Sequence, residues 1–291
     1  MPRVKDNAFI INKTDFGESD IIITLFSASR GKISCIAKGA KRSRKRFPGS
    51  LELFSQVAFN GFIKNPLALT RIDECQLVKP YLNIQEDLKN YLNGCYFLEI
   101  INRCAAERQS NRAIFNLLDE LFTFLSEGPH NRNFNCRIRL FELQIITLLG
   151  FKPELSHCLD CGMSLHRGNS PRRSFLFSPQ TGGLICNHCR PRHPAAFNVS
   201  KGTINLLNQA HRLDNELRNK VNFTPQVEAE SARLCRALLS WHSGYNFKSL
   251  QILEYFAANE NLFTTTQPTP NRPNALNLSM ESDNEFSRCY P

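Results

Sequence analysis

The chain has 291 residues, of which 42% are hydrophobic, so it is long enough for two or three compact units that each bury a core. Its formal net charge of +10 favours polyanionic partners, with nucleic acid ahead of an anionic membrane surface. The sequence shows neither a secretion signal nor an apolar stretch near the ~18 residues of a membrane span, so we expect a cytoplasmic protein without a membrane partner.

Residues 1–80 are predicted to form a small β-barrel. Short segments rich in β-branched and aromatic residues alternate with turn residues, a pattern that is typical of strands. The predicted strands lie at residues 8–13, 20–27, 31–38, 55–63 and 67–78. Five short strands suit an oligonucleotide-binding (OB) barrel, and an SH3-like barrel fits the count nearly as well.

A basic segment follows the third predicted strand. Residues 38–46 contain six cations and no acid, within a region that carries fourteen Lys and Arg against seven Asp and Glu. At the barrel rim such cations can neutralise phosphates and release counterions without reading base sequence. The aromatic ring of Phe47 could stack on a base, which would favour single strands. The expected DNA-binding residues are Lys38, Lys41, Arg42, Arg44, Lys45 and Arg46. A solvated charged loop is the alternative interpretation.

From residue 81 the pattern becomes helical, with apolar residues at intervals of three and four. Helices are predicted at residues 84–107, 111–126, 133–149, 200–219, 225–243 and 247–259. We therefore expect an α+β protein in which an all-helical domain follows the barrel and contains an inserted cysteine module. The expected units are the barrel at 1–80, the helical domain at 81–153 and 196–260, the module at 154–195, and a disordered Thr-, Pro- and Asn-rich tail at 261–291.

Two C-x2-C pairs, separated by 24 residues, predict a zinc site in the module. Thiols stay reduced in the cytoplasm, so the 11 cysteines do not indicate a disulfide framework. Each pair forms a tight knuckle that directs two sulfur atoms to one point, and two knuckles complete a tetrahedral set. The expected ligands are Cys158, Cys161, Cys186 and Cys189. Because four protein ligands leave no open position, we expect one structural zinc per chain.

Alternatives to this cysteine interpretation are weaker. A redox site needs only one C-x2-C pair, placed after a strand and opening a helix, and the residues near the first pair do not supply that context. His157 and His188 lie beside the knuckles and could replace a ligand, but the paired spacing favours the thiolates. The single cysteines elsewhere stand in apolar segments, which is typical of core residues. Arg172 and Arg173, between the knuckles, are a second and weaker candidate for nucleic-acid contact.

Several short motifs occur in a specific order along the chain. They are Gly17-Glu18-Ser19-Asp20, Gly31-Lys32, Lys38-Gly39-Ala40-Lys41-Arg42, Leu148-Leu149-Gly150-Phe151-Lys152-Pro153, the two cysteine pairs, and Ser178-Pro179-x2-Gly182-Gly183. In this order and spacing they resemble the bacterial RecO family of DNA repair proteins. The resemblance implies an OB barrel, a helical domain with an inserted zinc module, and a bacterial protein associated with the nucleoid.

The same resemblance implies a recombination mediator and not an enzyme. It implies binding of single- and double-stranded DNA, annealing of complementary strands, and help in loading recombinase onto strands coated with the single-stranded DNA-binding protein SSB. The implied protein partners are RecR and SSB, the latter through its C-terminal tail. Some relatives lack the four cysteines, so zinc is not implied for the whole family.

Three other functions remain as alternatives. An RNA-binding or ribosome-associated zinc protein would have a similar composition, and a zinc-stapled scaffold could hold protein partners on its helices. A metal-dependent nucleic-acid enzyme is disfavoured, because the chain lacks a Walker loop and an H-E-x-x-H motif, and because carboxylates are sparse near both basic regions. A groove lined by Arg137 and Arg139 could receive an acidic peptide tail, although exposed helix arginines are usually solvated.

Overall fold

The computed structural model describes residues 3–43, 45–63, 68–127, 134–164, 174–210 and 221–259. The predictions made for Arg44, for Arg172 and Arg173, and for the tail from residue 261 lie outside these ranges. Among the residues that the structure describes, no helix combines the length and the apolarity that crossing a membrane requires.

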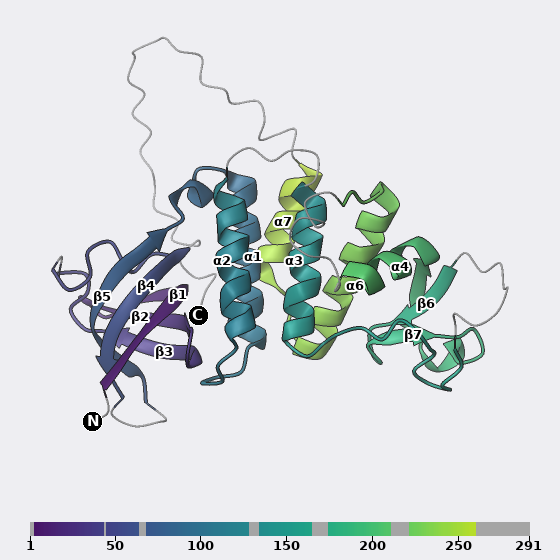
Figure 1. The fold of residues 1–291 in the computed structure, drawn as a ribbon, viewed down its shortest axis with the longest axis horizontal. Helices are drawn as coiled ribbons and strands as arrows, with labels where there is room; N and C mark the ends of the chain where they lie inside the picture. The colour runs from purple at the N-terminus through teal and green to yellow at the C-terminus, as the bar shows by residue number, and fades with distance from the viewer. Residues whose placement is uncertain are drawn as a thin grey trace, which may run out of the picture.

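The N-terminal region forms a five-stranded closed barrel with the strand order β1-β2-β3-β5-β4 (Figure 1). Its strands are β1 (Arg3–Phe16), β2 (Asp20–Ser27), β3 (Gly31–Ala37), β4 (Ser55–Phe62) and β5 (Thr70–Pro80). The long strand β1 pairs with both β2 and β4, and an irregularity between Ile10 and Asn12 interrupts its register with β2, as expected where a strand bends around a barrel. Strands β3 and β5 pair in parallel, and all other pairs of the barrel are antiparallel. The predicted five-stranded barrel is therefore confirmed.

The barrel buries two different apolar surfaces. Alternate strand residues such as Ile23, Leu25 and Phe59 fill its interior. Two further aromatic rings, Phe9 and Phe54, belong instead to the core of the helices, where both pack edge-on against Phe122. The barrel and the helices therefore share a continuous apolar interface.

The helical region contains α1 (Leu88–Cys104), α2 (Arg112–Ser126), α3 (Phe134–Leu148), α4 (Lys201–Ala210), α6 (Pro225–Ser243) and α7 (Lys248–Ala258). Helix α1 begins later than predicted because residues 82–85 form a 3-10 turn and the Asp87 side chain caps the helix by accepting from the Asn90 N–H. Asn111 and Thr224 cap α2 and α6 in the same way. Residues 211–219 of the fourth predicted helix lie outside the described residues.

The cysteine module lies between α3 and α4 in the sequence. Its strands β6 (Ser174–Ser178), β7 (Gly183–Ile185) and β8 (Phe197–Ser200) form a three-stranded sheet in the order β7-β6-β8. Figure 1 shows the barrel and this module at opposite ends of the molecule, with the helices between them. The α+β class is confirmed, and the exact domain boundaries remain predictions.

Candidate metal centre and nucleic-acid interface

The first cysteine knuckle is a tight turn that depends on one glycine. The N–H of Gly162 donates to the Cys158 carbonyl at 2.9 Å, and the N–H of Cys158 donates to the Met163 carbonyl at 2.9 Å. Gly162 has a φ of +74°, in the left-handed region that residues with a Cβ rarely adopt. The backbone of this turn directs both cysteine side chains of the pair toward the same side.

The hairpin of β6 and β7 carries the second knuckle onto the first. The N–H of Leu184 donates to the Glu154 carbonyl at 3.0 Å, and the N–H of Leu159 donates to the Leu184 carbonyl at 3.0 Å. A Cβ at Gly183 would lie 2.6 Å from the Glu154 carbonyl oxygen, so this approach requires glycine. Directly after β7, the N–H of Cys186 donates to the sulfur of Cys158 at 3.3 Å.

The four cysteine sulfur atoms lie within 4.8 Å of one another. The distance from Cys161 Sγ to Cys186 Sγ is 3.7 Å, which is far beyond a disulfide bond of about 2.05 Å. It agrees with the ~3.8 Å that separates two sulfurs on a tetrahedral zinc with bonds of about 2.3 Å. Burial raises the pKa of the Cys158 thiol, but hydrogen bonds from backbone N–H groups, that of Cys186 first among them, outweigh this and lower the pKa to about 6. The donor set fits zinc in spacing and in chemistry.

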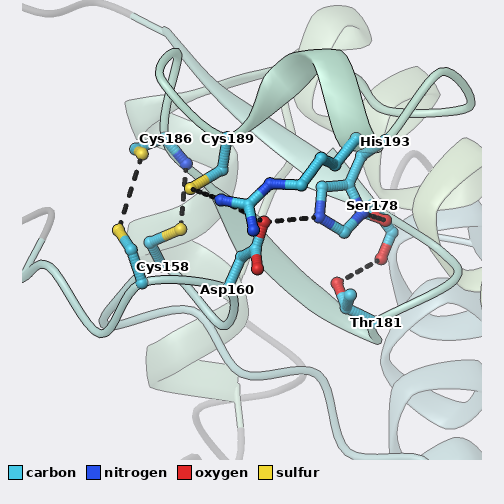
Figure 2. Close-up of polar contacts among 9 residues, drawn as sticks. Cys158, Asp160, Ser178, Thr181, Cys186, Cys189 and His193 are labelled. Atoms are coloured by element: carbon cyan, nitrogen blue, oxygen red, sulfur yellow. Dashed lines mark hydrogen bonds and ion pairs between the residues drawn. The ribbon is translucent and has the colours of Figure 1, made fainter.

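Polar side chains surround this sulfur cluster, and the sequence pattern did not identify them (Figure 2). Arg192 donates to Cys189 Sγ at 3.3 Å and contacts the Asp160 carboxylate at 3.3 Å. The buried ring of His193 lies 3.0 Å from the same carboxylate. Arg, Asp and His side chains form such contacts in too many sequence contexts for spacing alone to reveal them.

The two histidines that were considered as replacement ligands lie outside the cluster. His157 Nδ1 lies 3.3 Å from the Glu154 carboxylate and 3.0 Å from Ser156 Oγ. His188 is exposed on the second knuckle. Among the described residues, the group of potential ligands at this site consists of the four cysteines.

The basic segment forms the first part of the connection between β3 and β4, at the rim of the barrel. Lys38, Lys41, Arg42 and Lys45 are exposed, and Arg46 is partly buried. The β1–β2 hairpin holds the segment in place: the N–H of Gly39 donates to the carboxylate of Asp20, the first residue of β2, at 2.7 Å, and the N–H of Lys41 donates to the Ser19 carbonyl at 3.0 Å. The hydrogen bond from Gly39 keeps the pKa of Asp20 below its usual value.

Arg46 has a different role from the other described cations of the segment. Its guanidinium donates to the Lys38 carbonyl at 2.7 Å and to Ser43 Oγ at 3.1 Å, and it stacks over the Phe47 ring with 5.1 Å between Cζ and the ring centroid. The side chain therefore closes the loop on itself. Its charge is held at the base of the loop, whereas the side chains of Lys38, Lys41, Arg42 and Lys45 are exposed.

The expectation that carboxylates are sparse near this segment is wrong. Lys41 Nζ lies 2.9 Å from the Asp15 carboxylate, and Arg42 Nη2 lies 3.4 Å from the Glu18 carboxylate. Asp15 lies near the end of β1 and Glu18 lies in the turn that follows, and strand pairing brings both next to the loop. Among the described residues, no acid lies within ion-pair distance of Lys45.

The proposed stacking role of Phe47 is also wrong, because its side chain is only 6% exposed and belongs to the barrel core. A different aromatic ring is available at the same rim. Phe16, the last residue of β1, is 53% exposed. A hollow of about 440 Å³, lined by Lys13, Asp15 and Lys41 among others, opens between this strand end and the basic loop.

The arginines considered for a peptide groove are engaged within the chain. Arg139 is buried and forms an ion pair with Glu142, which also accepts from the Tyr96 hydroxyl. The guanidinium of Arg137 stacks over Phe124 with 4.5 Å between Cζ and the ring centroid. The idea that Arg139 offers a free charge to an acidic tail is therefore wrong.

Comparison with known proteins places this architecture among DNA repair proteins. The family model "Recombination protein O N terminal" matches residues 1–81, and "Recombination protein O C terminal" matches residues 85–251. The chain therefore belongs to the recombination protein O family.

Three curated relatives show how far the similarity extends, and each is named DNA repair protein RecO. The relative from Syntrophus aciditrophicus is 28% identical over 254 residues, covering 86% of this chain and 95% of the relative. The relative from Alkaliphilus metalliredigens is 27% identical, covering 86% of this chain and 98% of the relative. The relative from Anaeromyxobacter dehalogenans strain 2CP-C is 30% identical, covering 71% of this chain and 78% of the relative. The family supports a role in recombinational DNA repair.

Proposed function

We propose that the chain is a DNA-binding recombination mediator that anneals complementary single strands and helps load recombinase onto SSB-coated DNA, without catalysing a covalent step. The observation that carries this proposal is the group of exposed cations on one loop of the barrel rim. Among the described residues, the hydrogen bonds and ion pairs of this loop run to the β1–β2 hairpin, to β5 and within the loop itself. Lys38, Lys41, Arg42 and Lys45 are therefore exposed where phosphate can reach them, although Lys41 and Arg42 each have a carboxylate partner.

The barrel topology supports an OB barrel over the SH3-like alternative. Strand β3 pairs with β5 and β4 pairs with β1, so the sheet closes by a Greek-key path instead of a simple meander. OB barrels bind oligonucleotides on the face of their second and third strands and through neighbouring loops. Phe16 lies at the end of β1, directly before the β1–β2 turn, and Lys38 and Lys41 lie at the start of the β3–β4 connection, which packs against that hairpin.

Annealing requires two polyanions to approach each other, and the loop lowers the cost of that approach. Its cations neutralise phosphates and release counterions. Lys41 and Arg42 must exchange a carboxylate for a phosphate when DNA binds, because Asp15 and Glu18 pair with them in the free protein. This exchange makes each contact weak and reversible. Strands held in this way can shift register until they find their complement.

Phe16 complements the cations in this proposal. An exposed ring at a basic rim provides a surface on which an unpaired base can stack, and stacking tolerates any base sequence. Paired bases are already stacked within a duplex and gain little from such a surface. We therefore propose that Phe16 makes this end of the barrel bind single strands in preference to duplex.

The four cysteines are proposed to hold one structural zinc per chain. The ion, when bound, cross-links the two knuckles, and the β6–β7 hairpin and the first knuckle direct the sulfurs toward it. The proposed partners are single- and double-stranded DNA, RecR and the C-terminal tail of SSB, and the proposed location is the bacterial cytoplasm at the nucleoid.

The decisive experiment measures the annealing of complementary strands that are precoated with SSB, with and without this chain. The proposal predicts faster annealing with the chain and no acceleration by a variant with two reversed rim charges. Equal rates with and without the chain would refute it. Competition between single-stranded DNA and structured RNA at fixed salt separates this function from RNA binding, since an RNA-binding protein would prefer the RNA.

A further inference from the structure

The sulfur cluster is joined to three polar side chains that link the two knuckles independently of the cysteines. Asp160 lies inside the first knuckle, between its two cysteines, whereas Arg192 and His193 follow the second knuckle. A single carboxylate oxygen, Asp160 Oδ2, lies 3.3 Å from Arg192 Nη2 and 3.0 Å from His193 Nε2. The carboxylate therefore connects a segment of one knuckle to a segment of the other (Figure 2).

The local fold explains why Arg192 reaches a sulfur atom. Residues Arg190–Arg192 form a 3-10 turn, and the N–H of Arg192 donates to the Cys189 carbonyl at 3.1 Å. Side chains three residues apart lie above one another in a 3-10 turn. Arg192 stands three residues after Cys189, and its Nη2 lies 3.3 Å from Cys189 Sγ.

The charges at the site explain the role of the contact between Arg192 and Cys189. Four thiolates around a divalent ion carry a net charge of −2, and Asp160 places another negative charge beside them. Arg192 is the cation in contact with both: the same Nη2 atom, which has two N–H groups, lies within 3.3 Å of the sulfur and of the carboxylate. A hydrogen bond from a charged donor to a thiolate lowers the energy of the ionised sulfur.

The histidine anchors the other end of this network. His193 is 8% exposed, and its Nδ1 lies 3.4 Å from Ser178 Oγ at the end of β6. Its two ring nitrogens thus connect the Asp160 carboxylate to the sheet that carries the second knuckle. A side chain fixed at both nitrogens holds the carboxylate, and through it the guanidinium, in one orientation.

We infer that Asp160, Arg192 and His193 form a brace that positions Cys189 and supplies the counter-charge of the metal centre. This inference rests on the proposed zinc site and is independent of DNA binding. Groups that orient metal ligands in this way usually change metal affinity by ~10- to 100-fold when they are removed. The brace makes Arg192 a positioning residue for zinc, although its sequence position gives no sign of it.

The test compares two neighbouring arginines in the full-length protein. Arg190→Gln removes the same charge as Arg192→Gln, but the Arg190 side chain makes no hydrogen bond or ion pair among the described residues. Zinc affinity is measured by competition with a chromophoric chelator. We expect Arg192→Gln to weaken zinc binding by about 10-fold and Arg190→Gln to leave it unchanged. Cobalt in place of zinc provides a second readout, because loss of the hydrogen bond to Cys189 shifts the sulfur-to-cobalt charge-transfer band.

A double variant tests whether the residues act together. Asp160→Asn keeps the shape of the side chain, and it should weaken zinc binding by less than Arg192→Gln. The combination of both changes should be no worse than Arg192→Gln alone if Asp160 acts through Arg192. Equal effects of Arg190→Gln and Arg192→Gln, or wild-type affinity in Arg192→Gln, would overturn the brace. Absence of zinc binding by the wild-type protein would instead overturn the proposed metal centre itself.

Discussion

The two ends of the molecule build their candidate sites in different ways. At the cysteine module, the ligands come from two short motifs, and each motif forms its own turn before the hairpin brings them together. At the barrel rim, the cations come from one segment, but residues of a distant turn decide how that segment is held and how much of its charge is free. A metal centre is therefore specified mainly within its motifs, whereas a charged surface is specified by what folds next to it.

The largest effect is expected at the metal end. Cys158→Ser should reduce zinc from one ion per chain to almost none, because three ligands cannot hold a structural zinc that contributes roughly 10 kcal/mol or more to folding. DNA binding should fall by much less, since the barrel interior is a core separate from the sulfur cluster. Metal analysis and thermal unfolding measure the loss. Cys104→Ser changes a cysteine of α1 that lies outside the sulfur cluster. This control variant should keep its zinc.

Reversal of two rim charges is expected to have the next largest effect. Lys41→Glu combined with Lys45→Glu should weaken DNA binding by about tenfold or more at low salt. The slope of log affinity against log salt concentration should also become shallower, by the amount that corresponds to about two phosphate contacts. Titration of a labelled single strand at several salt concentrations provides both values. The control pair, Lys201→Glu with Arg190→Glu, makes the same change in net charge at the far end of the molecule. Equal weakening by the two pairs would show that total charge, and not the rim, controls binding.

Removal of the exposed ring should have a smaller and more selective effect. Phe16→Ala is expected to weaken single-strand binding by about fivefold, which corresponds to about 1 kcal/mol of stacking, and to leave duplex binding nearly unchanged. Tyr255→Ala, at a ring on α7 that is 64% exposed, is the matched control. Phe16→Trp should retain affinity, and its fluorescence should be quenched when a base stacks on it. A Phe16→Ala variant that loses single- and double-strand binding equally contradicts the stacking role.

The smallest predicted effect distinguishes two acids of the β1–β2 hairpin, Asp15 at the end of β1 and Asp20 at the start of β2. Asp15→Asn frees Lys41 from its ion pair and should strengthen DNA binding by about twofold, in keeping with the small energy of an exposed pair. Asp20→Asn should weaken binding, because the Asp20 carboxylate holds the Gly39 N–H and with it the position of the loop. The same titration measures both variants. Weaker binding by Asp15→Asn would mean that this acid holds the loop in place instead of competing with phosphate.

The strand and helix positions could be predicted because they depend on local periodicity. Alternating apolar residues in the barrel and apolar residues at intervals of three and four in the helices face the cores that the structure shows. Helix α1 starts later than predicted. The apolar residues before Asp87 suggested helix, but they form a 3-10 turn, and the Asp87 side chain caps the start of α1. The positions of the module's strands β6, β7 and β8 were not predicted, because these strands have only three to five residues each.

Aromatic residues show most clearly where sequence reasoning fails. Phe47 follows the basic segment directly and looks available in the sequence, but it is buried in the barrel interior. Phe16 lies more than twenty residues before the whole segment, and its ring is exposed at the rim. Burial depends on how the chain closes into a barrel, and an isolated apolar residue in a loop carries no periodic pattern that reveals its direction.

By itself, the sequence determined the barrel, the helices and the two C-x2-C pairs of the metal site, because each follows from residues that are close together in the chain. The tertiary structure alone decided which cations are free, which ring is exposed, and that Asp160, Arg192 and His193 gather beside the sulfurs. The physical reason is the same in each case. Charge pairing and exposure act through space over a few ångströms, and the chain brings together residues that its linear order keeps apart.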